Sequence, residues 1–103
     1  MKQYTQVRIR KNVKYFMIIQ GDFMGIKDLV AKRFEEICKE RNIRPNELAN
    51  ISGVTPSTVY SMLDNRRHDV SVITVKKLCD GLNITIGEFF SDELFNSAEQ
   101  EIK

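Results

Sequence analysis

The chain has 103 residues and a formal net charge of +2, with two cysteines and one histidine. This length predicts one domain with a single, modest core, and it leaves no room for a separate ligand-sensing domain. The longest apolar run, residues 15–19, is too short to span a bilayer, and no apolar targeting segment opens the chain. We therefore expect a cytoplasmic protein that has no membrane partner.

The charge is unevenly distributed along the chain. Residues 1–25 hold five Lys and Arg against one Asp, whereas residues 91–103 hold one Lys against four acidic residues. Residues 26–90 hold ten basic and nine acidic residues, which is less basic than a nucleic-acid-binding domain usually is. Binding to nucleic acid would therefore depend on clustered basic residues, and these cluster at Arg66 and Arg67.

The sequence offers little for catalysis or metal binding. Cys38 and Cys79 lie far apart within helical apolar patterns, and with His68 as the one histidine there is no zinc spacing. No carboxylate pair, activated nucleophile or phosphate-binding loop is present in the sequence. We expect a protein that is not an enzyme and holds no cofactor, with both cysteines as reduced core thiols.

Residues 1–25 form an N-terminal extension with a pattern of its own. Apolar and polar residues alternate there as they do in strands, with a turn at Lys11 and Asn12, which indicates a β-hairpin. A second interpretation is that the extension is not native protein. Residues 21–24 can be encoded by a purine-rich ribosome-binding sequence closely followed by a start codon, so that translation would begin at Met24.

Helical periodicity begins at residue 26. We expect a first helix over residues 26–41 that buries Val30, Phe34 and Ile37. The period of its apolar residues places these three side chains on one face.

The next two helices are expected to fold onto each other. One covers residues 45–52, and the other starts after Thr55, an N-cap residue followed by proline, and ends near Asp64. Gly53 lies between them, where a sharp turn requires positive φ, and Ala49 is small where the two helices cross. This pattern predicts a helix-turn-helix whose second helix can enter the major groove of DNA.

A polar loop over residues 65–70 leads to two further helices. The fourth helix starts after Ser71, and the fifth opens with residues 85–88, which fit a capping box, and carries two phenylalanines. We expect residues 96–103 to be a frayed polar tail. The apolar residues that these helices contribute are Val75, Leu78, Leu82, Phe89 and Phe90.

Three asparagines follow expected helix ends. Asn42, Asn65 and Asn83 come just after the first, third and fourth helices. After glycine, asparagine is the residue that most readily adopts the left-handed conformation that ends a helix. We therefore predict positive φ at all three.

An ordered set of short motifs links residues 26–90 to a known family. The motifs are Leu48-Ala49, Gly53-Val54-Thr55, Ser57-Thr58-Val59, Leu78-Cys79 and the closing ITIGEFF. In their order and spacing the chain resembles the lambda-repressor/Cro-type (Xre-type) helix-turn-helix DNA-binding domain. The resemblance implies an all-α, five-helix fold over residues 26–95, and because it starts just after Met24 it slightly favours residues 1–25 as non-native.

The resemblance implies that the third helix presents four residues to base edges. None of the four is Arg, Gln or Asn, the side chains that make bidentate contacts to guanine or adenine. Serine hydroxyls discriminate little between bases, while a proline and a tyrosine ring can pack against thymine methyl groups. We expect modest base readout from Pro56, Ser57, Tyr60 and Ser61.

The sequence offers more side chains for contacts to DNA phosphates than for contacts to base edges. The hydroxyls of Thr55 and Thr58, with the backbone amides that open the second and third helices, can hold phosphate oxygens. The resemblance places Arg66 and Arg67 in the loop that follows the DNA backbone. Relatives commonly have Gln where this chain has Pro45, so that phosphate contact is lost unless Asn46 replaces it.

The core also departs from the family pattern. Many relatives bury an Arg on the first helix against a Glu at the end of the third, and the matching residues here are Cys38 and Leu63. Losing both charges of a buried pair is often neutral or stabilising, whereas losing one is costly. The joint replacement predicts that Cys38 and Leu63 touch.

The C-terminal end is more apolar than one small domain needs. A DNA-binding protein with modest base contacts gains specificity by dimerising, because binding two half-sites multiplies its discrimination between DNA sequences. We therefore predict a homodimer that uses Phe89, Phe90, Leu94 and Phe95, next to Ile86. The alternative is that Phe89 and Phe90 close the core while Leu94 and Phe95 lie loose.

These features favour a sequence-specific transcriptional regulator, a repressor, that binds double-stranded DNA and has no evident small-molecule ligand. The alternative function is a helical protein-interaction module, such as a small antitoxin or adaptor, that uses the same fold with little DNA readout. The near-neutral charge and the short side chains of the third helix favour this alternative. Salt-titrated binding to random duplex DNA separates the two.

Overall fold

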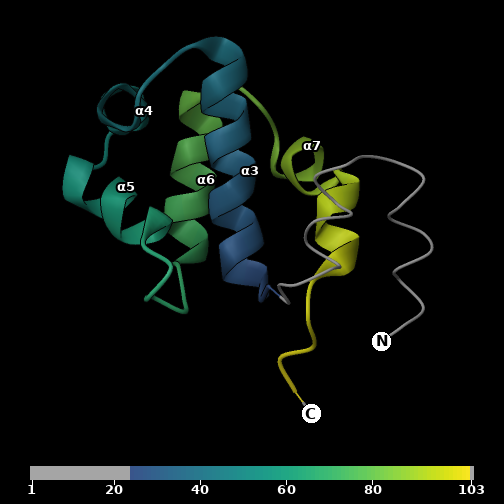
Figure 1. The fold of residues 1–103 in the computed structure, drawn as a ribbon. Helices are drawn as coiled ribbons and strands as arrows, with labels where there is room; N and C mark the ends of the chain where they lie inside the picture. The colour runs from purple at the N-terminus through teal and green to yellow at the C-terminus, as the bar shows by residue number, and fades with distance from the viewer. Residues whose placement is uncertain (1–23, 103) are drawn as a thin grey trace.

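The computed structural model describes residues 24–102 of the chain. Over these residues it contains five α-helices and one 3₁₀-helix and no strand, which confirms the predicted all-α class (Figure 1). The two interpretations of the N-terminal extension, as a hairpin or as non-native sequence, concern residues 1–25, and residues 1–23 of that segment lie outside the described part.

The longest helix, α3 (Ile26–Arg41), runs through the middle of the domain (Figure 1). Its inward face buries the predicted Val30, Phe34 and Ile37, together with Leu29. The helix ends at Asn42, whose φ of 58° confirms the predicted left-handed cap.

Helices α4 (Pro45–Ser52) and α5 (Pro56–Leu63) form the predicted helix-turn-helix. Gly53 has a φ of 70°, as the turn requires, and the Val54 N–H donates to the Ala49 carbonyl over 3.1 Å. Ala49 is fully buried within α4, so a larger side chain there would have to displace its neighbours. The inward face of the two helices consists of Leu48, Ala49, Val59 and Met62.

The rest of the domain is α6 (Val72–Gly81), α7 (Ile86–Phe90) and a 3₁₀-helix, η1 (Glu93–Ser97). The capping box predicted at the start of α7 is present, because the Glu88 N–H donates to Thr85 Oγ1 over 2.9 Å and Glu88 Oε1 accepts from the Thr85 N–H over 2.8 Å. Asn83 follows α6 with a φ of 61°, as predicted.

Helix α6 closely approaches the end of α4 at Gly81. A Cβ atom there would lie 2.9 Å from Ser52 Cα and 3.0 Å from the Ile51 carbonyl oxygen. Both neighbours are backbone atoms that cannot swing away, so the crossing of α4 and α6 requires glycine.

The prediction for Asn65 is wrong, because its φ is not positive. Helix α5 ends at Leu63, and its C-cap residue, Asp64, has extended backbone (φ −74°, ψ 116°) rather than the left-handed conformation. The Asp64 carboxylate accepts the Arg66 N–H over 2.9 Å. This side-chain turn stops the helix, so Asn65 has no need of positive φ.

The C-terminal segment packs against α3. The rings of Phe34 and Phe89 lie 4.4 Å apart between centroids, and Leu94 is fully buried beside Leu29. The Arg33 guanidinium bridges to Asp92 over 3.5 Å. The segment after α7 is therefore part of the core.

Two corrections follow for the predicted dimer surface. Phe89 and Leu94 each have 0% of their surface exposed within one copy of the chain, so neither side chain can reach a partner. Phe90 remains 38% exposed, and Phe95 is half-buried. The alternative arrangement is wrong as well, since Leu94 is buried and Phe90 is exposed.

The tail is not frayed where we expected it to be. Asn96 and Ser97 belong to η1, the Glu99 N–H donates to the Met24 carbonyl over 2.9 Å, and Glu101 Oε2 accepts from the Ile26 N–H over 3.4 Å. The carboxylate supplies an acceptor at the N-terminus of α3, where backbone donors lack partners within the helix. The tail therefore returns to the start of α3 (Figure 1).

The predicted contact of Cys38 with Leu63 involves two residues that line one cavity. This cavity, of about 450 Å³, lies between α3 and the helix-turn-helix. Both residues are on its wall, so they are on the same side of the domain, and their direct contact stays a prediction. In the part of the chain that the structure describes, no helix is both long and apolar enough to cross a bilayer.

Candidate nucleic-acid interface

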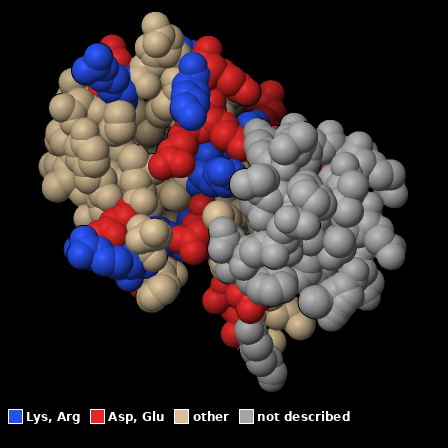
Figure 2. Space-filling view, in the orientation of Figure 1, with Lys and Arg blue, Asp and Glu red and all other residues tan. Residues whose placement is uncertain are grey.

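Helix α5 presents an uncharged polar face to the outside. Val59 and Met62 point into the core, while Pro56, Ser57 and Tyr60 are exposed. Tyr60 keeps 51% of its surface accessible, and Ser61 is half-buried. In Figure 2 the surface over α4 and α5 is largely free of charged side chains, which lie around its edges.

The hydroxyl groups at the start of α5 bond to one another. Thr55 Oγ1 accepts from the Thr58 N–H over 3.2 Å, and it lies 3.0 Å from Ser57 Oγ and 2.9 Å from Thr58 Oγ1. Thr55 therefore serves as the N-cap of α5, as predicted. Its bonds also order the two neighbouring hydroxyls that would meet a phosphate.

A hydroxyl-lined hollow of about 290 Å³ lies between α5 and the start of α6. Its polar walls come from both helices and from the loop that joins them. The side chains combine hydroxyl donors with one guanidinium, a set that suits phosphate oxygens, and one carboxylate opposes that charge. The lining includes Ser57, Thr58, Ser61, Arg67, Asp69, Ser71 and Thr74.

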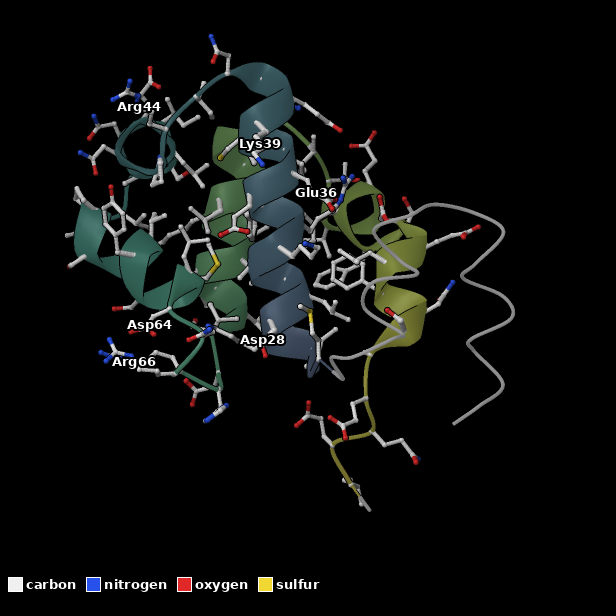
Figure 3. The ribbon with its side chains drawn as sticks, in the orientation of Figure 1. Asp28, Glu36, Lys39, Arg44, Asp64 and Arg66 are labelled. Atoms are coloured by element: carbon white, nitrogen blue, oxygen red, sulfur yellow. The ribbon has the colours of Figure 1, made fainter. Side chains whose placement is uncertain are left out.

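The two arginines of the predicted basic cluster have different surroundings. Arg67 lines the hydroxyl-lined hollow. Arg66 instead pairs with Asp64, whose carboxylate accepts from Nε over 3.0 Å and from Nη2 over 2.9 Å. Figure 3 shows Asp64 and Arg66 at the edge of the domain below α5.

The charge on Asp64 persists over the ordinary pH range. Its hydrogen bonds from Arg66 lower the pKa of the carboxyl group to about 2. Because Arg66 faces a permanent carboxylate, much of its positive charge is offset locally. The basic cluster is therefore less basic than its sequence indicates.

Asn46 lies apart from these residues. It is exposed in the first turn of α4 and is not among the residues that line the hollow. The N-terminal turn of α4 is closed by Glu47, whose Oε1 accepts the Arg44 N–H over 2.8 Å.

Several residues in and around this interface were not identified from the sequence. Ser71 was taken only as the N-cap of α6, although it also lines the hollow with Thr74. The spacing of Asp64 and Arg66, two positions apart after a helix, is a local signal of the observed turn. Lys27 has no such signal, because its contact with Asp64 joins residues that are 37 positions apart.

A family model supplies the decisive comparison. The model for the Cro/C1-type HTH DNA-binding domain matches residues 33–94, which is more than half of the chain. The chain belongs to the Cro/C1-type helix-turn-helix DNA-binding domain family. No curated protein and no solved structure matches it. The matched residues span α4, α5 and α6, so this Cro/C1-type domain identifies the chain as a DNA-binding regulator in general terms.

Proposed function

We propose that this Cro/C1-type protein is a sequence-specific transcriptional repressor that places α5 in the major groove of double-stranded DNA. The observation that carries the proposal is the exposed face of α5 within a matched helix-turn-helix domain. A helix in this position can reach base edges, and bound protein would occlude a promoter.

Base recognition is assigned to Pro56, Ser57, Tyr60 and Ser61. The exposed ring of Tyr60 and the ring of Pro56 offer apolar surface to thymine methyl groups. The serine hydroxyls can both donate and accept, so they add hydrogen bonds with little preference for one base.

Phosphate contacts are assigned to Thr55, Thr58, Arg67 and Arg66, with Asn46 on α4. Arg67 and Thr58 share the hydroxyl-lined hollow, where one phosphate oxygen could accept from both. Arg66 is exposed, with 85% of its side chain accessible.

The protein is expected to act as a homodimer, because two half-sites compensate for modest readout by each copy. The apolar residues left for such an interface at the C-terminal end are Phe90 and Phe95, since their predicted companions are buried.

The proposal is tested by selecting bound duplexes from a random pool and then measuring affinity at several salt concentrations. Enrichment of a palindromic sequence is expected. Arg67→Ala should weaken binding to all sequences and lower the salt slope by about 1, because one phosphate contact is lost. Ser57→Ala should instead change the preferred sequence.

Lys39→Ala is the matched control for Arg67→Ala. It removes one exposed positive charge from α3, at a residue that is not among those lining the hollow. If Arg67→Ala behaves as Lys39→Ala does, and no sequence is enriched, the proposal fails.

One observation favours the alternative, a protein-interaction module. Residues 24–102 hold ten Lys and Arg against thirteen Asp and Glu, so their net charge of −3 opposes attraction to DNA. An interaction module should show no salt-dependent binding to random duplex DNA, whereas a repressor should show binding that falls as salt rises.

A further inference from the structure

We propose that Asp64 is a positioning residue that is anchored by Lys27 and fixes the guanidinium of Arg66 at the DNA-facing edge of α5. This inference rests on the proposed function, because it assigns a role to Arg66 in binding DNA. It concerns the Lys27–Asp64–Arg66 network. In this network the backbone carbonyl of Asp64 accepts a hydrogen bond from Lys27, and its carboxylate accepts hydrogen bonds from Arg66.

The anchor comes from the first turn of α3. Lys27 keeps only 4% of its surface exposed, and its Nζ donates to the Asp64 carbonyl oxygen over 2.6 Å. A buried ammonium group needs such an acceptor. The carbonyl at the end of α5 suits it, because backbone carbonyls at a helix C-terminus carry partial negative charge. Lys27 thus ties the end of α5 to α3.

The carboxylate of Asp64 holds Arg66 at three points. It accepts from the Arg66 backbone N–H over 2.9 Å, from Nε over 3.0 Å and from Nη2 over 2.9 Å. The Asp64 side chain is 24% exposed and that of Arg66 is 85% exposed. The Asp64 carboxylate is therefore largely covered by the protein, while the Arg66 guanidinium projects into solvent.

Arg66 retains donors for DNA in this arrangement. A guanidinium carries five N–H donors, and Asp64 uses one on Nε and one on Nη2. The remaining donors are already oriented before any ligand arrives. Preorganisation of this kind lowers the cost of ordering a long side chain on binding.

The charges argue for orientation rather than attraction as the contribution of Arg66. Residues 64–69 contain two arginines and two aspartates, and the Asp64 carboxylate lies 2.9 Å from Arg66 Nη2. The pair adds little net positive charge, so it should release few counterions from DNA. Its value to binding then lies in where the donors point.

Asp64→Ala gives a result that loss of folding would not. Removing a carboxylate beside DNA should strengthen binding to random duplex, because repulsion falls. An oriented donor meets its phosphate only in the register of the selected complex. Releasing Arg66 should therefore weaken binding to the selected duplex, so that the ratio of selected to random affinity falls by roughly three- to tenfold. A merely destabilised protein would lose both affinities together.

Two further variants isolate the role of Asp64. Glu40→Ala removes the same charge from an exposed position on α3 that does not line the hollow, and it leaves Arg66 held, so it should keep the ratio. Arg66→Ala should lower the ratio, and adding Asp64→Ala to it should lower the ratio no further. An unchanged ratio in Asp64→Ala, or an equal fall in the Arg66→Ala background, would overturn the positioning role.

A measurement without DNA separates this inference from the proposed function. In the free protein, the Arg66 Nε–H should give an NMR signal protected from exchange that is lost in Asp64→Ala and reduced in Lys27→Met. Absence of that protection in the wild-type protein overturns the network itself. Protection in a wild-type protein that binds no duplex overturns the proposed function, and the DNA role of Arg66 with it.

Discussion

The carboxylate of Asp64 accepts three hydrogen bonds from Arg66, a residue two positions further along the chain. In the sequence, Arg66 and Arg67 look like one basic cluster, and we grouped them for that reason. The structure separates them, because Arg67 lines the hollow while Arg66 is paired. The sequence shows two positive charges, but it does not show that the Asp64 carboxylate offsets the charge of Arg66.

The two cysteines are a second case in which surroundings decide behaviour. Both thiols are free and buried. Burial, reinforced by the nearby Asp80 carboxylate, raises the pKa of Cys79 to about 11. Burial also raises the pKa of Cys38 above its usual value. Since the thiolate is the reactive form, both groups should be inert near neutral pH.

We predict that a disulfide reagent labels neither thiol readily at pH 8 in the native protein, and labels both at once in denaturant. A raised pKa also means that the folded state holds its thiol proton more tightly. The free energy of unfolding should therefore fall as the pH rises from about 9 toward about 11, as Cys79 titrates first in the unfolded chain. Rapid labelling of both thiols in the native protein would contradict this prediction.

At the scale of elements, helix ends were predictable where a local signal fixes them. Thr55 and Ser71 cap α5 and α6, and Gly53 and Asn42 have the positive φ that their positions required. Asn65 failed because a side-chain turn from Asp64 ends the helix in another way. Two local signals competed there, and the charged acceptor determined the turn.

The crossing of α4 and α6 had no such signal. Gly81 reads in the sequence as an ordinary helical glycine, and only the packing of α4 against it shows why a side chain does not fit.

We predict that Gly81→Ala lowers the free energy of unfolding by about 1–3 kcal/mol, because the new methyl group meets the backbone of α4. Urea denaturation followed by circular dichroism measures the change. The gain in helix propensity, about 1 kcal/mol, acts in the opposite direction, so the observed loss is a net value.

Gly87→Ala in α7 is the matched control. A Cβ atom at Gly87 would meet only Thr85 Oγ1, at an ordinary 3.8 Å, so this variant should be neutral or slightly more stable. Equal stability of the two variants would mean that the crossing does not require glycine.

At the scale of the whole molecule, sequence reasoning gave the all-α fold and the position of the helix-turn-helix. It did not give the contacts that close the domain, because these join distant residues. Leu94 packs on Leu29 from the other end of the chain, and Lys27 reaches Asp64 across the domain. For the candidate site, the exposed residues of α5 were named from the sequence, and the contact of Lys27 with Asp64 was not.

We predict that Leu94→Ala lowers the free energy of unfolding by about 2–5 kcal/mol, as expected for a fully buried leucine. Ile102→Ala is the control, since Ile102 is 87% exposed and its truncation should change stability by less than about 0.5 kcal/mol. Chemical denaturation of both variants decides the matter. A Leu94→Ala protein as stable as the control would place the C-terminal segment outside the folded unit.

We also predict that Phe90→Asp shifts the protein from dimer to monomer in sedimentation equilibrium without changing its helix content. Phe90 is partly exposed and contacts the rings of Phe89 and Phe95 at centroid distances of 4.9 and 4.8 Å, so it can present an edge to a partner. Ile102→Asp should leave the dimer intact. A wild-type protein that stays monomeric at micromolar concentration would refute the interface.

The return of the tail to α3 has a practical consequence for any assay. Gly25, Lys27, His68 and Glu101 line one pocket, so the last described residues lie beside the loop that carries both arginines. A purification handle or fluorophore attached after residue 102 would emerge next to that loop. Dyes and handles for binding experiments are better placed at the exposed end of α3, near Glu40.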